Sequence, residues 1–371
     1  MLPSNKLNKY FVVAVLFFAF VRFAAAQTGD TKLTQLRRQL AMEYMQPAPH
    51  LALAKYYWQK GDRLQAFYIS EYARRARFPE PIFDQAFANA FSGAARYSNA
   101  PVGMSWLDES KTTAPTPKKD DKQATETFEK AIAMQKSGKL EPAEDLFVKA
   151  AELAPESIEI QSWTGRFFYK VKADNPRALE YYLNAYFLSP HAYETEFVES
   201  RIRKINWEAA EIKFTQLIKS GVSLTQMTDD TNPTVVLMAL ERMSVQWKPE
   251  YLNAVVEQMK HDDETLRWQA TEAVMKNVTR SFDKTLESLL QDEDLRRRGL
   301  AAYVAAHLWK QESFPILRNM LNEKAQLLRF DALSALIEEA SPQAFKIISD
   351  HRQNETDAKL KELIDKSLAR P

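Results

Sequence analysis

The tetrapeptide His261-Asp262-Asp263-Glu264 places an imidazole next to three carboxyl groups. Imidazole and carboxylate groups are common ligands of divalent metal ions, so one interpretation is a metal site. The other is structural, because the tetrapeptide directly precedes a predicted helix, where acidic groups cap free N–H groups and oppose the helix dipole. Asp292-Glu293-Asp294 stands at the same place before the next predicted helix, without a histidine. This recurrence favours capping, and we expect no metal ion.

Three arginines, Arg267, Arg296 and Arg329, recur at one position of successive segments of similar sequence. In a functional interpretation they form a basic ladder that binds an acidic partner. In a structural interpretation each guanidinium bonds acids or carbonyl groups of the preceding turn, as Asp263 and Asp292 permit. We favour the structural interpretation, because stacked helical units must satisfy the polar groups of their loops. The three arginines remain the only named candidates for a binding site.

Two basic clusters contain Arg74, Arg75 and Arg77 in the first case, and Arg201 and Arg203 in the second. They are typical of solvated helix faces, and the alternative is an envelope-associated protein that binds glycan or anionic lipid through them. His50, His191, His307 and His351 are scattered, and His307 borders an apolar stripe. The sequence contains no Ser-His-Asp order, nucleophile elbow, phosphate loop or zinc helix. We therefore predict that the protein is not an enzyme and has no cofactor.

Glu199-Ser200 is similar to the catalytic dipeptide of exported lytic transglycosylases, in which a helical superhelix precedes a lysozyme-like domain. The Gly-Leu-Met-Gln stretch that accompanies this dipeptide is missing here, and the chain leaves no room for the catalytic domain. A glycan-active enzyme of this kind stays the weakest alternative, since two adjacent common residues do not define a site.

The composition favours helices, because glycine contributes only 8 of 371 residues and the chain is rich in good helix formers. The formal net charge of +1 indicates no nucleic-acid binding. Residues 1–26 resemble a signal peptide: Lys6 and Lys9 precede the apolar run Phe11–Val21, and Ala24-Ala25-Ala26 provides a cleavage site. The run is short for a membrane span, so we expect export to a periplasm or the medium, with an N-terminal membrane anchor as the alternative. Cysteine is absent, so stability must come from packing.

Three segments share one internal spacing of small and aromatic residues. The steps between their first, second, third and last residues are 3, 9 and 7, in the sets Ala54, Tyr57, Ala66, Ala73; Ala131, Met134, Ala143, Ala150; and Arg166, Tyr169, Ala178, Ala185. Two antiparallel helices approach closely only where small residues meet, so the spacing predicts repeated helix hairpins. Gly61 and Gly138 fall between the paired helices, where a left-handed turn is needed. In the third unit we expect Asn175 as N-cap and Pro176 as the first helical residue.

These segments resemble tetratricopeptide repeats, whose second helix carries alanine, a large residue, alanine and then proline. The pattern matches Ala143, Phe147, Ala150 and Pro155 best, and Ala178, Tyr182, Ala185 and Pro190 nearly as well. Phe83, Phe87 and Phe91 predict one further packed helix. The stretch 108–122 has no apolar periodicity and is typical of a linker.

The pattern changes after residue 230. The segments 266–273, 295–302 and 328–335 share leucine, arginine, a small residue three positions on and alanine three positions further, and 235–242 is a degraded copy. This half resembles HEAT repeats of the short bacterial kind, with helix starts at Asn232-Pro233 and Ser341-Pro342 and a terminal capping helix at about 355–369.

The sequence thus predicts an all-α protein, specifically a two-part α-solenoid. The expected parts are a signal peptide at 1–26, tetratricopeptide-like regions at 27–107 and 123–228 around the linker at 108–122, and HEAT-like repeats at 229–371. Stacked repeats form long surfaces that vary without harm to the core. The resemblance implies a non-catalytic scaffold or assembly factor that binds a protein or peptide partner and meets the membrane only during export.

Overall fold

The computed structural model describes residues 30–76, 78, 80–91, 122–188 and 192–369. Within these residues every regular element is a helix and no strand occurs, so the predicted all-α class is confirmed. The predicted signal peptide lies outside the described residues. The predicted linker does too, apart from Lys122, which begins a helix.

The first ten elements run to residue 219. They are α2 (Thr31–Met42), α3 (Pro47–Gln59), α4 (Arg63–Ala76), α5 (Glu80–Phe91), α6 (Lys122–Lys136), α7 (Leu140–Leu153), α8 (Ile158–Phe167), the π-helical turn η2 (Phe168–Lys172), α9 (Asn175–Leu188) and α10 (Ala192–Lys219).

The remaining elements are shorter on average and include three 3₁₀ turns. They are α11 (Leu224–Met227), α12 (Pro233–Val245), η3 (Pro249–Tyr251), α13 (Leu252–Gln258), α14 (Glu264–Asn277), η4 (Arg280–Phe282), α15 (Asp283–Leu289), α16 (Leu295–Trp309), η5 (Lys310–Ser313), α17 (Phe314–Met320), α18 (Gln326–Glu339), α19 (Pro342–His351) and α20 (Ala358–Leu368).

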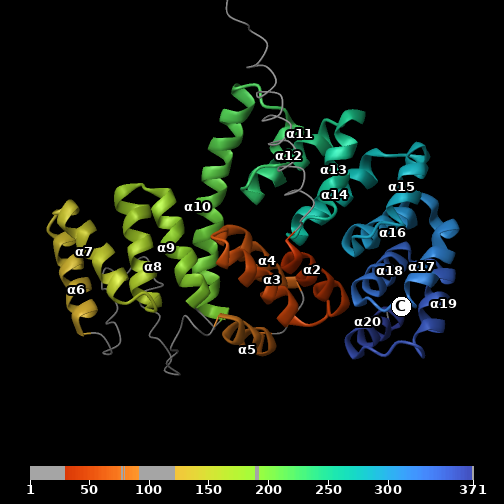
Figure 1. The fold of residues 1–371 in the computed structure, drawn as a ribbon, viewed down its shortest axis with the longest axis horizontal. Coiled ribbons are helices and arrows are strands. Elements are labelled where there is room, and N and C mark those ends of the chain that lie inside the picture. Colours follow the sequence, from red (N-terminus) through yellow and green to blue (C-terminus); the bar gives the residue numbers. More distant parts are fainter. Residues whose placement is uncertain (1–29, 77, 79, 92–121, 189–191, 370–371) are drawn as a thin grey trace, which may run out of the picture.

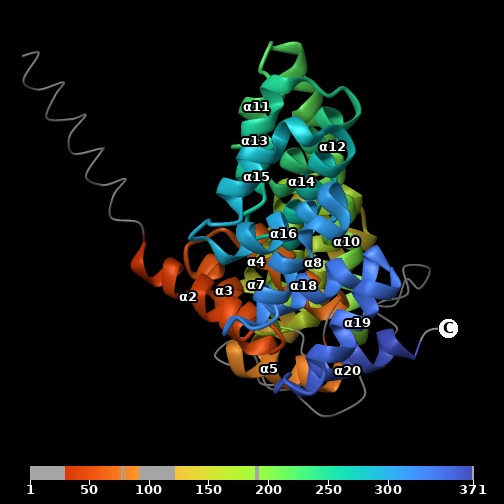
Figure 2. The ribbon, with the colours of Figure 1, turned by 90° about the vertical axis from the view of Figure 1, so that its right-hand side faces the viewer.

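The helices pack in a series that runs from α6 and α7 at one end to α19 and α20 at the other (Figure 1). Neighbours along the chain pair closely, among them α3 with α4, α6 with α7, and α8 with α9. Seen after a quarter turn, the C-terminal helices lie in front of α8 and α10 (Figure 2). Each helix therefore buries its apolar stripe mainly against the helices beside it.

The small residues of the predicted hairpins lie where two helices meet. Ala143, Ala150, Ala178 and Ala185 are completely buried. Close approach of two helix backbones requires a side chain of this size, because a larger one would hold the helices apart. Gly61 and Gly138 have φ values of 85° and 77°, so the predicted left-handed turns are present.

The third hairpin departs from the predicted spacing by one residue. Gly165, not Arg166, packs against the partner helix, and a Cβ at Gly165 would meet the ring of Tyr182 at 3.1 Å. The extra residue is taken up by η2, since a π-helical turn inserts one residue into a helix. Arg166 is half-buried, and its guanidinium lies over the Trp163 ring at 4.8 Å.

The start of α9 also differs from its prediction. Asp174, not Asn175, supplies the cap: its Oδ1 accepts a hydrogen bond from the N–H of Arg177 at 3.1 Å, and α9 begins at Asn175. Ala173 ends η2 with φ of 54°, which moves the cap one residue earlier than the Asn-Pro signal indicates.

The second half follows its predicted pattern more closely. Asn232 and Ser341 cap α12 and α19, each followed by a proline in the first helical turn. The last position of the predicted pattern is an alanine in each of α14, α16 and α18. These alanines, Ala273, Ala302 and Ala335, are buried. The last helix, α20, spans Ala358–Leu368, slightly shorter than expected.

The order of the hairpins in space differs from their order along the chain. The N-terminal hairpin α3–α4 and the helix α5 pack on α9, and Phe187 of α9 contacts Trp58, Phe87 and Phe91 at ring-centroid distances of 4.4, 6.1 and 4.8 Å. The predicted phenylalanine helix is thus present and buried in α5. The first hairpin lies between α9 on one side and the C-terminal helices on the other (Figure 1).

Two clusters of buried apolar side chains fill the interior. One runs from the N-terminal helices to Ile205 and the other from Ala210 to the C-terminus, so they divide within α10. The predicted boundary at 228/229 falls in the turn between α11 and α12. Met45, Leu295 and Phe330 pack against both clusters and join them.

Candidate functional site

Arg267 is buried at the start of α14. Its Nη1 donates to the carbonyl oxygens of His261 and Asp262 at 2.7 and 3.2 Å, and Nη2 lies 3.3 Å from Oε2 of Glu264. Only 4% of its side chain is exposed. The guanidinium therefore satisfies the turn that precedes its own helix, as the structural interpretation requires.

Arg296 and Arg329 make contacts of the same kind in the next two units. Arg296 donates from Nε and Nη2 to the carboxylate of Asp294 at 3.0 and 2.5 Å. Arg329 donates from Nη1 to the carbonyl oxygens of Glu323 and Lys324, and from Nε to Glu355 at 3.1 Å. The three arginines do not form a ladder that faces solvent.

The polar side chains of the tetrapeptide His261-Asp262-Asp263-Glu264 have different roles. Asp263 caps α14 by accepting from the N–H of Thr265 at 2.8 Å, and Nδ1 of His261 accepts from the N–H of Asp263 at 2.9 Å. Burial lowers the pKa of His261, which keeps the ring neutral and able to accept. Among the described residues no group of metal-binding side chains occurs.

Asp262 binds the N-terminal helices to the C-terminal ones. Arg37 of α2 donates to it through both Nε and Nη2, at 2.9 and 2.7 Å. The hydroxyl of Tyr57 and Nη1 of Arg296 donate to the same carboxylate. Burial alone would raise the pKa of Asp262, but the charges and hydrogen bonds of Arg296 and Arg37 outweigh it and hold the pKa well below its ordinary value.

Further contacts of the N-terminal segment lie at the N-terminal ends of α12, α14, α18 and α20. The Tyr68 hydroxyl lies 3.0 Å from Oγ1 of Thr234 at α12, and the Tyr44 hydroxyl donates to Glu264 at α14. The N–H of Met45 donates to Gln326 at α18, and its carbonyl oxygen accepts from Lys359 at α20, at 3.0 and 2.8 Å. We call the N-terminal ends of these helices, together with Asp262 before α14, the inner edge. The inner edge is covered by N-terminal residues of the same chain.

The two basic clusters meet at a second buried site, between α4 and α10. Arg74, Arg75 and Arg203 all donate to the carboxylate of Glu199, which is completely buried. Arg203 and Arg75 also contact Glu71. The arginines of this site thus pair with buried acids, and Glu199 is enclosed by guanidinium groups where a substrate cannot reach it. Arg77 lies outside the described residues.

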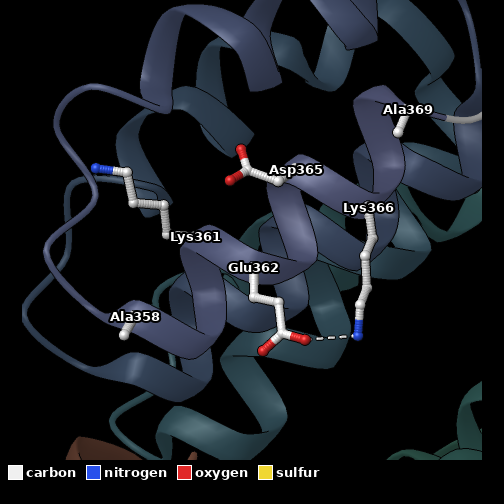
Figure 3. Close-up of a pocket in the computed structure, with 6 residues that line it drawn as sticks. All are labelled: Ala358, Lys361, Glu362, Asp365, Lys366 and Ala369. Carbon is white, nitrogen blue, oxygen red and sulfur yellow. Dashed lines mark ion pairs between the residues drawn. The ribbon is translucent and has the colours of Figure 1, made fainter.

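A hollow on α20 is lined by one helix face. Figure 3 shows its lining residues, which are Ala358, Lys361, Glu362, Asp365, Lys366 and Ala369. Glu362 pairs with Lys366 at 2.7 Å and Asp365 pairs with Arg352 at 2.5 Å. Its two carboxylates are therefore matched by neighbouring cations and do not converge on a common point, which a catalytic pair must do.

The predicted histidines are dispersed in the structure. His50 is buried and bonds the carbonyl oxygen of Tyr44 at 2.9 Å, and His351 is buried beside Glu355. His307, expected at the edge of the core, is exposed, although partial desolvation lowers its pKa. His191 lies outside the described residues.

A surface that the sequence reasoning missed lies on α8, η2 and α10. Three cations stack over aromatic rings of their own helix: Arg166 over Trp163 at 4.8 Å, Lys170 over Tyr169 at 5.1 Å, and Arg201 over Phe197 at 5.2 Å. Lys204 of α10 lies 6.0 Å from the Tyr169 ring and so connects the two helices. We call these residues the α8–α10 surface. For Trp163 and Arg166, and for Phe197 and Arg201, the available signal was an aromatic residue followed one turn later by a cation; Tyr169 and Lys170 are adjacent in the sequence.

Comparison with protein-family models, with curated proteins and with solved structures finds no significant match to this chain. The function of the chain is therefore inferred from its sequence pattern and from the contacts of its described residues. Of the helices that the structure describes, none is both long and apolar enough to span a bilayer.

Proposed function

We propose that this chain is an exported, non-catalytic scaffold that binds other proteins, built from tetratricopeptide-like hairpins followed by HEAT-like hairpins. The repeat assignment is supported by the buried alanines at matched spacing and by the series of paired helices. Export is supported by the pattern of residues 1–26 and is part of the same proposal.

One observation carries the assignment of a binding role. The buried arginines and acids of the inner edge and of the Glu199 site bond one another, whereas the α8–α10 surface keeps Lys170 and Lys204 exposed. Polar groups that are satisfied inside the fold hold it together, while an exposed cation such as Lys204, which lies 6.0 Å from the Tyr169 ring, can contact a partner at the surface. The α8–α10 surface is therefore the proposed contact region.

Site-specific photo-crosslinking in the native host tests this function. A photoreactive phenylalanine analogue at position 170 or 204 should give a discrete protein adduct, and the same analogue at position 248, an exposed lysine of the C-terminal half, should not. Equal adducts at all three positions, or none at any of them in folded protein, would contradict a binding role for this surface.

Mass measurement of the intact protein from the same host tests export. Cleavage after Ala26 would leave Gln27 as the first residue of the mature chain. A chain that retains residues 1–26 and sediments with membranes would support the anchor alternative instead.

A further inference from the structure

One face of α10 carries residues at the spacing of a helix that packs lengthwise against another helix. Lys204, Trp207, Glu211, Phe214 and Ile218 follow one another at alternating intervals of three and four residues, so they lie along a single stripe. We call these five residues the α10 stripe. The C-terminal half of α10, to which most of the stripe belongs, extends past α8 and α9 (Figure 1).

Large apolar side chains of the α10 stripe are open to solvent. Trp207 and Ile218 are each 47% exposed, and Phe214 between them is half-buried. In the part of the chain that the structure describes, six large apolar side chains are exposed, and three of them lie on α10. Tryptophan is among the residues most enriched in protein contacts, so this concentration indicates a surface that a protein covers.

The two charged residues of the α10 stripe stand on opposite sides of Trp207. Lys204 comes three residues before it and Glu211 four residues after it. Both are exposed, and neither forms an ion pair with any described side chain. Lys213 of the same helix, which lies off the stripe, does pair with Asp230, at 2.8 Å. The stripe therefore offers one cation and one anion, two turns apart, to a partner.

This charge pattern is complementary to itself in one orientation. If two copies of α10 pack antiparallel with a twofold axis near Trp207, Lys204 of each copy lies beside Glu211 of the other. A parallel pair would instead set Lys204 against Lys204 and Glu211 against Glu211, which like-charge repulsion disfavours. The order of the charges thus selects a second, antiparallel copy of the same helix.

We propose that the chain forms a homodimer in which the α10 stripes of two copies pack antiparallel across Trp207. The inference rests on the proposed binding function and names one partner, a second copy of this chain. The two Trp207 rings cover each other at the centre, and two ion pairs between Lys204 and Glu211 flank them and fix the orientation.

The expected dimer is weak, because a single pair of helices lies at the low end of specific interface size. We expect a dissociation constant of about 10 µM. The chain is then a monomer at about 1 µM or below, where its stability does not depend on the contact. Sedimentation equilibrium of the purified full chain from about 1 to about 100 µM should show the mass rising toward that of two chains.

Charge reversal assigns the contact to Lys204 and Glu211. Lys204→Glu and Glu211→Lys should each raise the dissociation constant at least about tenfold, since each places two pairs of like charges in the interface. An equal mixture of the two variants should associate as the unchanged chain does, because opposite charges then meet at both pairs. Lys248→Glu, which reverses an exposed lysine of the C-terminal half, is the control and should leave association unchanged.

Circular dichroism verifies that each variant folds. If a reversed variant does not fold, Trp207→Ala replaces it and should also weaken association about tenfold or more. Three outcomes overturn the dimer: a mass of one chain at every concentration, single reversals that associate like the unchanged chain, and a mixture that associates no better than either variant alone.

Crosslinking at position 204 separates the dimer from the broader function. If the purified chain is a monomer while position 204 captures a different protein in the host, the scaffold function stands and the dimer falls. If the purified chain dimerises and every adduct has the mass of two chains, the dimer stands and the binding of other proteins falls.

Discussion

The inner edge and the α8–α10 surface use the same residue types in opposite ways. At the inner edge, Arg37, Tyr57 and Arg296 converge on Asp262, whose side chain is only 2% exposed. At the α8–α10 surface, arginine and lysine lie over Trp163, Tyr169 and Phe197, and Lys170 and Lys204 remain exposed. A buried carboxylate that matches the cations makes the first region part of the fold, while the second region holds its cations over rings at the surface, where we propose that a partner binds.

The comparison also explains why the repeated arginines are poor candidates for a binding ladder. Helices α2 to α4 of the same chain occupy the inner edge, where a partner of a curved array would otherwise lie. A partner that used this edge would have to displace a hydrogen-bonded interface with a buried charge.

The largest expected effect on stability comes from a substitution at the inner edge. Asp262→Ala removes the acceptor shared by Arg37, Tyr57 and Arg296 and leaves Nη1 of the buried Arg296 without its acceptor, which should lower the free energy of unfolding by about 3–5 kcal/mol. Urea unfolding followed by circular dichroism measures it. Asp365→Ala, which removes the exposed partner of Arg352, is the control and should hardly move the unfolding midpoint. Similar midpoints for the two variants would refute the role given to Asp262.

The sequence predicted the helices and hairpins well, because their determinants are local. The alanine spacing, Gly61 and Gly138 in left-handed turns, and the caps Asn232 and Ser341 each act within a few residues. The third hairpin shows where prediction from a fixed local spacing fails. A fixed spacing selects Arg166, but the π-helical turn shifts the true contact to Gly165, and no local composition signals that insertion.

The arrangement of the hairpins and the inner edge could not be predicted. Arg37 and Asp262 are separated by 225 positions along the chain, and periodicity within a helix carries no information about such a pair. Asp262 was recognised only as one of several acids before a helix, and its neighbour Asp263 is the actual cap. The α8–α10 surface was missed for a similar reason, since Arg166 was assigned to the hairpin and Arg201 to a solvated cluster.

A smaller effect should follow from filling the contact at Gly165. Gly165→Val places branched carbons against the ring of Tyr182, where even a Cβ would lie at 3.1 Å, and overpacking of this kind costs about 1–3 kcal/mol. Ala133→Val at an exposed position of α6 is the control and measures the helix penalty of valine alone. Thermal unfolding compares the two variants. If both lose the same stability, the close approach of α8 and α9 is not as described.

Acid should weaken the inner edge before it affects the α8–α10 surface. The folded pKa of Asp262 lies below its ordinary value of 3.8, so its carboxylate stabilises the fold above that pH, and the contribution is lost as the pH falls toward the folded pKa. Asp262→Asn lacks this contribution. We therefore expect the urea midpoint of the unchanged chain to fall more steeply below about pH 4 than that of the variant, while the other acids act equally in both. Parallel curves would contradict the prediction.

The smallest expected effect on stability belongs to the surface with the largest expected effect on binding. Lys170→Glu/Lys204→Glu alters exposed side chains, and Lys204 has no ion partner among the described residues, so the free energy of unfolding should stay within about 0.5 kcal/mol of the unchanged chain. Urea unfolding under the conditions of the Asp262→Ala experiment measures this directly. A loss comparable to that of Asp262→Ala would mean that the cations of the α8–α10 surface hold the fold together, as those of the inner edge do, and the distinction between the two regions would fail. Unchanged stability would instead show that the exposed Lys170 and Lys204 do not hold the fold together, unlike the cations of the inner edge.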